Sequence, residues 1–234
     1  MSFTKISTVS LTDLFVQQIE NMILSGELAV GQRMPSARDL SIRMGVSRPV
    51  ISAGLIQLEK LGFVEIRPRQ GAYVCDYRRK GTVETLVAIM RYNGGAMRRN
   101  EVTSLLQVRH ALETLCMELV IRHASMGDLE KITPLLDEVE AGKTPEETAQ
   151  AVFAFHHELA VLSGNVLLPL LYHSFRSESL YLWTICCRQL GCRHLYETKL
   201  ALYRALLNRD IPEAERITDR SIQVAMEQLA AYIS

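Results

Sequence analysis

The spacing of apolar residues changes just after Leu61, and this change limits the possible folds more than any other feature of the sequence. Between Leu11 and Leu61, apolar side chains recur at three- and four-residue steps, which is the period of amphipathic helices. From Phe63 to Val74, two short runs of β-forming residues flank the tip sequence RPRQG. The N-terminal part is therefore predicted to be helical with one small β-hairpin.

Capping and turn residues divide the helical part into three segments. Gly26 ends the first helix. Ser36 is placed to cap a second helix that Gly45 ends, and Ser47 is placed to cap a third helix that Gly62 ends. The order helix, helix, tight turn, helix, hairpin is typical of a winged helix-turn-helix.

The rest of the chain shows only helical patterns. We expect a winged helix-turn-helix domain at residues 1–76, a polar linker at 77–81 and an all-helical domain at 82–234, so the fold class is mainly α. The second domain is predicted to be a bundle of about seven helices. The expected helices cover Val83–Tyr92, Glu101–His123, Gly127–Glu140, Glu146–Leu162, Val166–Arg188, His194–Asn208 and Ile211–Tyr232.

Charge is distributed unevenly along the chain. Residues 1–80 carry 11 Lys and Arg against 7 Asp and Glu, whereas residues 81–234 carry 15 against 19. The formal charge of zero thus combines a basic N-terminal part with an acidic C-terminal part. A basic segment attracts a polyanion, which favours nucleic acid as the partner of the first domain.

Several classes of protein are disfavoured. We find neither an export leader nor a membrane span, and we expect a cytoplasmic protein with reduced thiols, because its five cysteines form no C-x-x-C pair. No nucleophile with an adjacent base and no phosphate-binding loop is evident, and His156-His157-Glu158 lacks the spacing of a zinc protease motif. We therefore predict that the chain is not an enzyme.

The N-terminal turn of the third helix carries the candidate base-reading residues. In a helix-turn-helix this turn lies in the major groove of DNA, and here it presents Ser47, Arg48 and, one turn later, Ser52. The Arg48 guanidinium can bond O6 and N7 of a guanine. Arg38 in the preceding helix can reach a phosphate or a neighbouring guanine.

Residues Gly31–Val74, GQRMPSARDLSIRMGVSRPVISAGLIQLEKLGFVEIRPRQGAYV, resemble the winged helix of GntR-family transcriptional regulators. The shared pattern joins pG..LPseReLa to GvSR..v..Al..Le..Gl...r.r.G.fV. One departure is Ser52, which stands where some family members place a second recognition-helix arginine. With the resemblance included, the candidate DNA-contacting residues are Arg38, Ser47, Arg48, Ser52, Arg67, Arg69, Gln70 and Gly71.

The second domain resembles the FCD domain of the FadR subfamily, which dimerises and binds effectors. The matching residues are Leu105-Leu106-Gln107-Val108-Arg109, Glu113, Phe155-His156, Leu162-Ser163-Gly164-Asn165, Ala205, Asp210 and Ala214. Many FCD proteins bind a divalent metal through an Asp and three His. The corresponding positions are Val152, His156, Lys199 and Ser221, and one His cannot hold a metal, so we expect neither metal nor cofactor.

The replacements suggest a different ligand. Lys199 would set an ammonium close to where the metal would lie, and Arg109 resembles a family arginine that faces the cavity. We predict an anionic organic effector, such as a carboxylate or an acyl conjugate. The candidate effector-binding residues are Arg109, His156, Lys199, Ser221, Tyr172 and Trp183. In the alternative interpretation, Lys199 extends to the surface and Arg109 pairs with a carboxylate on its own helix.

Together these features predict a sequence-specific DNA-binding regulator. Helical domains of this kind form homodimers, and a two-fold dimer presents two recognition helices to the half-sites of a palindromic operator. A repressor released by its effector is the expected mode of action. The alternatives are a metal-responsive regulator and a DNA-binding regulator that needs no ligand.

Overall fold

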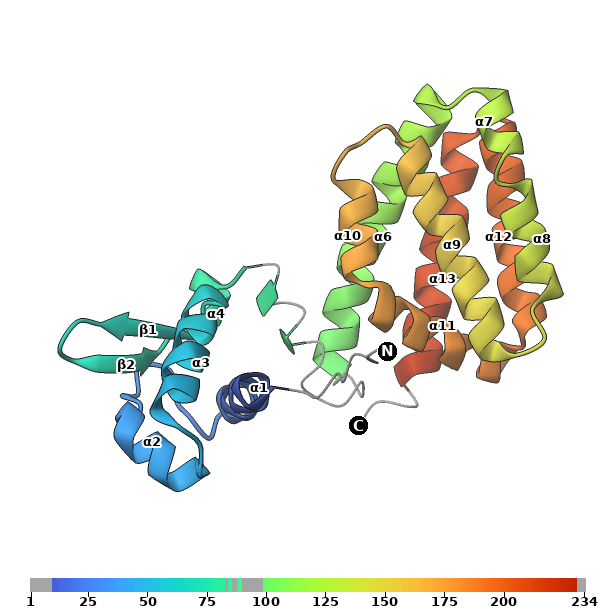
Figure 1. Cartoon of the computed structure of the whole chain (residues 1–234). Coiled ribbons are helices and arrows are strands. Elements are labelled where there is room, and N and C mark those ends of the chain that lie inside the picture. The colour runs from blue at the N-terminus through green and yellow to red at the C-terminus, as the bar shows by residue number, and fades with distance from the viewer. Residues whose placement is uncertain (1–9, 83, 86–87, 90–98, 231–234) are drawn as a thin grey trace, which may run out of the picture. The chain divides into compact units, whose positions relative to one another are not determined.

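The computed structural model describes residues 10–82, 84–85, 88–89 and 99–230. The chain divides into two compact units, Met1–Gly94 and Gly95–Ser234, which we call the head and the body (Figure 1). The described residues form helices and one two-stranded antiparallel sheet. The predicted fold class, mainly α with a winged helix-turn-helix and a helical bundle, is confirmed.

The described residues of the head include the three predicted helices and the hairpin, in the predicted order. Ser10 and Ser36 cap α1 and α2, because each hydroxyl accepts a hydrogen bond from the backbone amide three residues later. Gly45 ends α2 in the left-handed conformation, with φ 67°. The elements are α1 (Leu11–Leu24), α2 (Ala37–Met44), α3 (Arg48–Lys60), β1 (Val64–Arg67) and β2 (Gly71–Val74).

The core of the head depends on a close approach between α1 and α3. Phe15 and Ile19 of α1 are buried together with Ile51 and Leu58 of α3. A Cβ atom added at Gly54 would lie 2.2 Å from Cδ1 of Phe15. The absence of a side chain at Gly54 therefore lets the phenyl ring pack directly against the α3 backbone.

Part of the segment expected to be a linker is helical. Residues 77–81 include a short helix, α4 (Tyr77–Lys80), and the Tyr77 ring lies 5.7 Å from the ring of Phe63. Further along, the hydroxyl of Thr85 donates to the carbonyl of Leu61, and Ala88 is buried in the core of the head. Tyr77, Thr85 and Ala88 thus contact the head, which continues beyond the boundary expected at residue 82. The helix expected at 83–92 falls largely outside the described residues.

The body contains longer helices, and two predicted helices are each divided in two. Pro134 has no amide hydrogen and lies in the first turn of a new helix, which separates α7 from α8. Phe175 leaves the helical conformation, with φ −99° and ψ 17°, and separates α10 from α11. The helices are α6 (Arg99–His123), α7 (Met126–Glu130), α8 (Thr133–Ala141), α9 (Pro145–Leu162), α10 (Leu168–Ser174), α11 (Arg176–Leu190), α12 (Cys192–Leu207) and α13 (Ile211–Ala230).

The body helices pack side by side as a bundle (Figure 1). Helix α9 contacts α8, α10 and α11, and α13 contacts α6 and α12. Fully buried apolar residues such as Leu106, Phe155 and Leu206 fill the space between them. Within the part of the chain that the structure describes, no helix combines the length and the apolar character needed to cross a bilayer.

Candidate functional site

The N-terminus of α3 carries a polar side chain that has no hydrogen-bond partner among the described residues. Ser47 occupies the N-cap position, as predicted, but its side chain makes no capping hydrogen bond. Pro49 lies in the first turn, where its missing amide removes one of the donors that a capping side chain would bond. The Ser47 hydroxyl is therefore available to another molecule.

The predicted base-reading side chains lie on α2 and α3. Arg38, Arg48 and Ser52 are all exposed. Arg48 has no hydrogen bond and no ion pair with any residue that the structure describes. An unpaired guanidinium beside the start of a helix, where backbone amides point outward, is suited to contact an anionic surface.

The two predicted arginines of the wing differ in whether they are paired with another side chain. Arg69 adopts the left-handed conformation with φ 62°, and the amide of Gln70 closes the turn on the carbonyl of Arg67 at 3.0 Å. Arg67 bonds Glu65 at 3.1 Å and lies over the ring of Tyr73. Arg69 is exposed at the tip and has no such partner among the described residues. Within the part of the chain that the structure describes, Arg69 is therefore an unpaired cation of the wing and Arg67 is not.

Sequence reasoning missed one cation on this surface. Arg33 pairs with Tyr73 in an isolated antiparallel bridge, so the loop before α2 lies alongside β2. Its side chain is exposed and lies near Gly71, where an added Cβ would be 3.5 Å from Nε of Arg33. The loop sequence around Arg33 is rich in turn residues and carries no strand pattern, which is why the bridge was not predicted.

A cluster of ionisable side chains is buried in the body. Nε of Arg109 donates to Oε1 of Glu113 at 2.5 Å, one helical turn further along α6. Both side chains are buried, with 8% and 2% of their surface exposed. Lys199 of α12 is only 1% exposed. Arg109 thus pairs with a carboxylate on its own helix, as in the alternative interpretation, whereas Lys199 does not extend to the surface.

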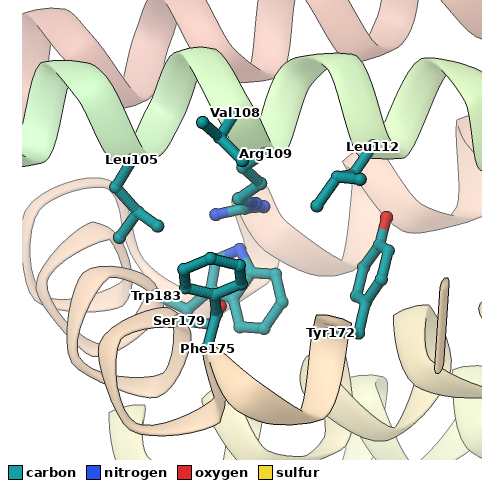
Figure 2. Close-up of a pocket in the computed structure, with 8 residues that line it drawn as sticks. All are labelled: Leu105, Val108, Arg109, Leu112, Tyr172, Phe175, Ser179 and Trp183. Carbon is teal, nitrogen blue, oxygen red and sulfur yellow. The ribbon is translucent and has the colours of Figure 1, made fainter. Parts of the chain in front are cut away.

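Aromatic rings join this cluster to α9, α10 and α11. The guanidinium of Arg109 lies over the Trp183 ring, with Cζ 4.3 Å from its centroid. His156 stacks on Trp183 at 5.3 Å and on Tyr172 at 6.4 Å. Figure 2 shows Arg109 reaching from α6 toward Trp183, with the Tyr172 hydroxyl directed toward Leu112. We call this group of side chains, including Glu113 and Lys199, the chamber cluster.

Two members of the chamber cluster lack hydrogen-bond partners. Both ring nitrogens of His156 and the hydroxyl of Tyr172 are buried, and they bond no other described residue. A buried polar atom without a partner costs free energy unless another molecule supplies the bond. These atoms are therefore candidate contacts for a ligand.

Burial and mutual charge set the protonation states of the cluster. Burial raises the pKa of the Glu113 carboxyl, but Arg109 and other nearby cationic groups outweigh it and hold this pKa at about 2. Burial lowers the pKa of Lys199 to about 8 against the attraction of Glu113. Burial and the Lys199 ammonium keep the pKa of His156 well below its ordinary value. Near neutral pH the cluster thus holds two cations, one carboxylate and a neutral imidazole.

Two small cavities flank the Arg109–Trp183 contact. The cavity in Figure 2 lies between α6, α10 and α11 and is lined by Leu105, Val108, Arg109, Leu112, Tyr172, Phe175, Ser179 and Trp183. The second is lined by Arg109, Leu182, Trp183, Cys186, Leu190, His194, Leu195, Ser221, Val224 and Ala225. Each has a volume of about 20 Å³, enough for a water molecule.

The structure brings the predicted effector-binding residues into one region. Arg109 and Trp183 line both cavities, Tyr172 lines the first and Ser221 lines the second. His156 stacks between the rings of Tyr172 and Trp183. The residue that the prediction left out of the site is Glu113, although its position four residues after Arg109 on one helix was a usable signal.

Two family models match the chain, one in each domain. The model of bacterial regulatory proteins of the gntR family matches residues 12–74, and the FCD domain model matches residues 104–224. This chain belongs to the GntR family. It is a DNA-binding transcriptional regulator whose C-terminal domain is of the ligand-binding FCD type.

Relatives of this GntR-family chain are also regulators. It is 29% identical over 202 residues to the HTH-type transcriptional regulator LutR of Bacillus subtilis, covering 83% of this chain and 90% of that protein. It is 25% identical over 177 residues to the HTH-type transcriptional regulator Mce2R of Mycobacterium tuberculosis, covering 76% and 73%.

Solved structures share the fold. The Listeria monocytogenes protein Lar, described as controlling expression of the agr system, superposes with a TM-score of 0.64 at 14% identity, covering 97% of this chain and 99% of that one. A GntR-family regulator from Pseudomonas syringae gives a TM-score of 0.50 at 16% identity, covering 94% and 85%. At these identities, the similarity supports the GntR-family fold alone.

The residues present do not fit the divalent metal of many FCD domains. Val152 offers no donor atom, and the buried Lys199 ammonium would repel a cation next to His156. Among the described residues, no group of three or more His, Cys, Asp or Glu side chains is placed to hold a metal. The donor set of this GntR-family chain therefore does not support metal binding at that position.

Proposed function

We propose that this chain is a cytoplasmic repressor that binds a palindromic operator as a homodimer and is released by a small organic anion bound in the chamber cluster. The observation that supports an anionic effector is the charge of the cluster. Arg109 and Lys199 are buried with one carboxylate, that of Glu113. No ion pair joins Lys199 to a carboxylate among the described residues, so the cluster has an excess positive charge.

A ligand carboxylate would supply the missing negative charge. An uncompensated buried charge is costly, because water no longer solvates it and no partner replaces the water. The low pKa of Lys199 reflects this cost. A carboxylate beside Lys199 and Arg109 would form charge-assisted hydrogen bonds, which are about twice as strong as neutral ones.

The unpartnered atoms of the cluster add a second requirement. Neutral His156 offers one donor and one acceptor, and the Tyr172 hydroxyl can act as either. An effector that carries a hydroxyl or carbonyl oxygen near its acid group would satisfy these atoms together with the cations. This pattern favours a hydroxy- or oxo-acid over a simple aliphatic acid.

Effector binding would move helices, because the cavities are too small for an organic acid as they stand. Each holds about 20 Å³, whereas ligand pockets usually exceed about 300 Å³. Helix α10 is short and carries Tyr172, so its outward movement would enlarge the cavity. Such a movement couples the ligand to the shape of the body, with a typical coupling free energy of about 1–3 kcal/mol.

A thermal-shift screen tests the effector. Hydroxy-, oxo-, di- and aromatic carboxylates and acyl conjugates are added to the full chain, with and without EDTA. We expect at least one carboxylate to raise the melting temperature of the wild type in EDTA, and Lys199→Met to reduce that shift. Lys131→Met, an exposed lysine on the same domain, is the matched control. Stabilisation by divalent metal alone would support a metal-responsive regulator instead.

A selection of bound duplexes from a random pool tests the operator. We expect the wild type to enrich a short palindrome, because two related recognition helices would read two half-sites. If no ligand shifts stability but a palindrome is enriched, the regulator acts without a ligand. If no duplex is preferred, sequence-specific repression is wrong.

A further inference from the structure

A groove between α12 and α13 is much larger than either cavity of the chamber cluster. Its volume is about 300 Å³, against about 20 Å³ for each of the others. Residues spaced three and four apart on both helices face it, as expected for one face of each helix. The groove is lined by His194, Glu197, Thr198, Ala201, Arg216, Ile217, Arg220, Ser221 and Val224.

The groove shares three lining residues with one of the two small cavities of the chamber cluster. His194, Ser221 and Val224 line the groove and also the cavity that contains Arg109 and Trp183. Each of the three is partly buried rather than closed off from solvent. Arg109 and Trp183 in turn line the cavity of Figure 2. A continuous series of shared side chains thus leads from the groove to the centre of the cluster.

The charges of the groove favour an anion. Arg216 is neutralised by Glu213 through two bonds of 2.7 and 2.6 Å, and Glu197 bonds Arg193 at 3.1 Å. Arg220 is exposed and has no hydrogen bond or ion pair to the described residues. A cleft with an excess cation raises the local concentration of anions and their rate of entry.

We propose that the α12–α13 groove is the entrance of the anionic effector. Arg220 attracts the carboxylate into the groove, and a gate formed by His194, Ser221 and Val224 admits it to Arg109. The wide groove accommodates a small molecule as it stands, which the inner cavities do not. This inference rests on the proposed function, because it assumes that the chamber cluster binds an anion.

The other possible entrance is the cavity of Figure 2. Its lining includes Val108, whose side chain is 48% exposed. That cavity carries no cation besides Arg109, which is engaged by Glu113. An anion would find less attraction there, and the two entrances can be blocked separately.

Trp183 provides a test that needs no identified effector. It is the single tryptophan of the chain, belongs to the chamber cluster and is 3% exposed. Its fluorescence therefore reports which molecules reach that cluster. The full chain is titrated with iodide as the anionic quencher, acrylamide as the neutral one and caesium as the cationic one. The variants are Val224→Phe in the gate, Arg220→Glu in the groove and Val108→Phe at the other opening.

We expect Val224→Phe to reduce quenching by both iodide and acrylamide. Arg220→Glu should reduce iodide quenching about threefold, leave acrylamide unchanged and increase caesium quenching, because it reverses the attracting charge. Arg204→Glu makes the same charge change on α12 outside the groove and should have little effect. Arg220 is exposed, so its variant keeps the test valid even if Val224→Phe fails to fold.

Two results overturn the proposal. One is a loss of iodide quenching in Val108→Phe with none in Val224→Phe or Arg220→Glu. The other is equal iodide quenching in the wild type and Arg220→Glu. Neither depends on the carboxylate screen, so failure of the entrance and failure of the effector hypothesis are distinguishable.

Discussion

In the head, Arg48 and Arg69 lie on the surface with no partner among the described residues, whereas in the body Arg109 and Lys199 are buried with the carboxylate of Glu113 and a set of aromatic rings. Exposed cations keep their hydration until they meet a phosphate, and they bind by exchanging counterions. Buried cations have already lost their hydration, so their cost is present in the folded protein whether or not a ligand arrives. The exposed cations of the head are suited to a partner that binds at the surface, whereas the buried cations of the body are suited to an enclosed ligand.

The two groups of residues also differ in how far apart their members lie in the sequence. The candidate DNA-contacting residues of the head come from a short segment between Arg33 and Gly71, and their positions follow from local caps and turns. The chamber cluster combines residues from Arg109 to Lys199, carried on five helices. Substitutions in the body should therefore change stability and ligand binding together, whereas those on the head surface should change DNA binding alone.

The largest effect is expected from Glu113→Gln. It leaves Arg109 and Lys199 buried without a counter-charge, and breaking such a buried pair costs about 3–5 kcal/mol. Urea unfolding followed by Trp183 fluorescence measures the change in the body. Glu197→Gln, which breaks an exposed pair with Arg193, should cost about 0–1 kcal/mol.

Combining Glu113→Gln with Lys199→Met sharpens this prediction. Removing one of the two unpaired cations should restore part of the lost stability, because the remaining charge excess is smaller. Additive losses in the double variant would show that Glu113 does not act through charge.

The next effect concerns the close contact of α1 and α3. In Gly54→Ala, the new methyl group would overlap the Phe15 ring, and overpacking of this kind costs about 1–3 kcal/mol. Hydrogen exchange should show loss of protection in the head, while the Trp183 unfolding curve of the body is unchanged. Ala53→Ser, on the exposed side of the same turn, is the control. A shift in the Trp183 curve would mean that the two domains do not unfold independently.

Much of the head was predictable because its signals are local. Ser36, Gly45 and the RPRQG tip lie at the ends of the elements that they define, so one pass along the sequence locates them. The helix at Tyr77–Lys80 was not predicted, because its residues after Tyr77 are charged and exposed and only Tyr77 packs against Phe63. Nothing in the local pattern distinguishes such a covering turn from a free one.

In the body, the family resemblance identified Arg109, His156 and Lys199, but not how they interact. The pairing of Arg109 with Glu113 follows a simple four-residue step and was open to prediction. The burial of Lys199 was not, because an amphipathic helix that contains one lysine predicts an exposed charge. Only the packing of α12 against its neighbours places that ammonium inside.

A smaller effect, confined to DNA binding, is expected from Arg48→Ala. Losing one bidentate contact to guanine should reduce discrimination by about 1–3 kcal/mol at a single position of each half-site. Repeating the duplex selection with this variant measures it, and the melting temperature should not change. Lys60→Ala, at the opposite end of α3, is the control for loss of positive charge. An unchanged sequence preference would remove Arg48 from the candidate DNA-contacting residues.

The smallest effect is the pH dependence of effector binding. The pKa of Lys199 in the ligand-free protein is about 8, so the ammonium is present below that pH and is lost as the pH rises through it. An anion binds the protonated form, so the affinity for a stabilising carboxylate should fall about tenfold per pH unit above pH 8. Titrations at pH 7 and pH 9 measure this loss. Lys199→Met should bind more weakly at pH 7 and show no such fall, because Arg109 keeps its charge throughout this range. Equal pH dependence in the two proteins would assign the titration to another group and separate Lys199 from the bound anion.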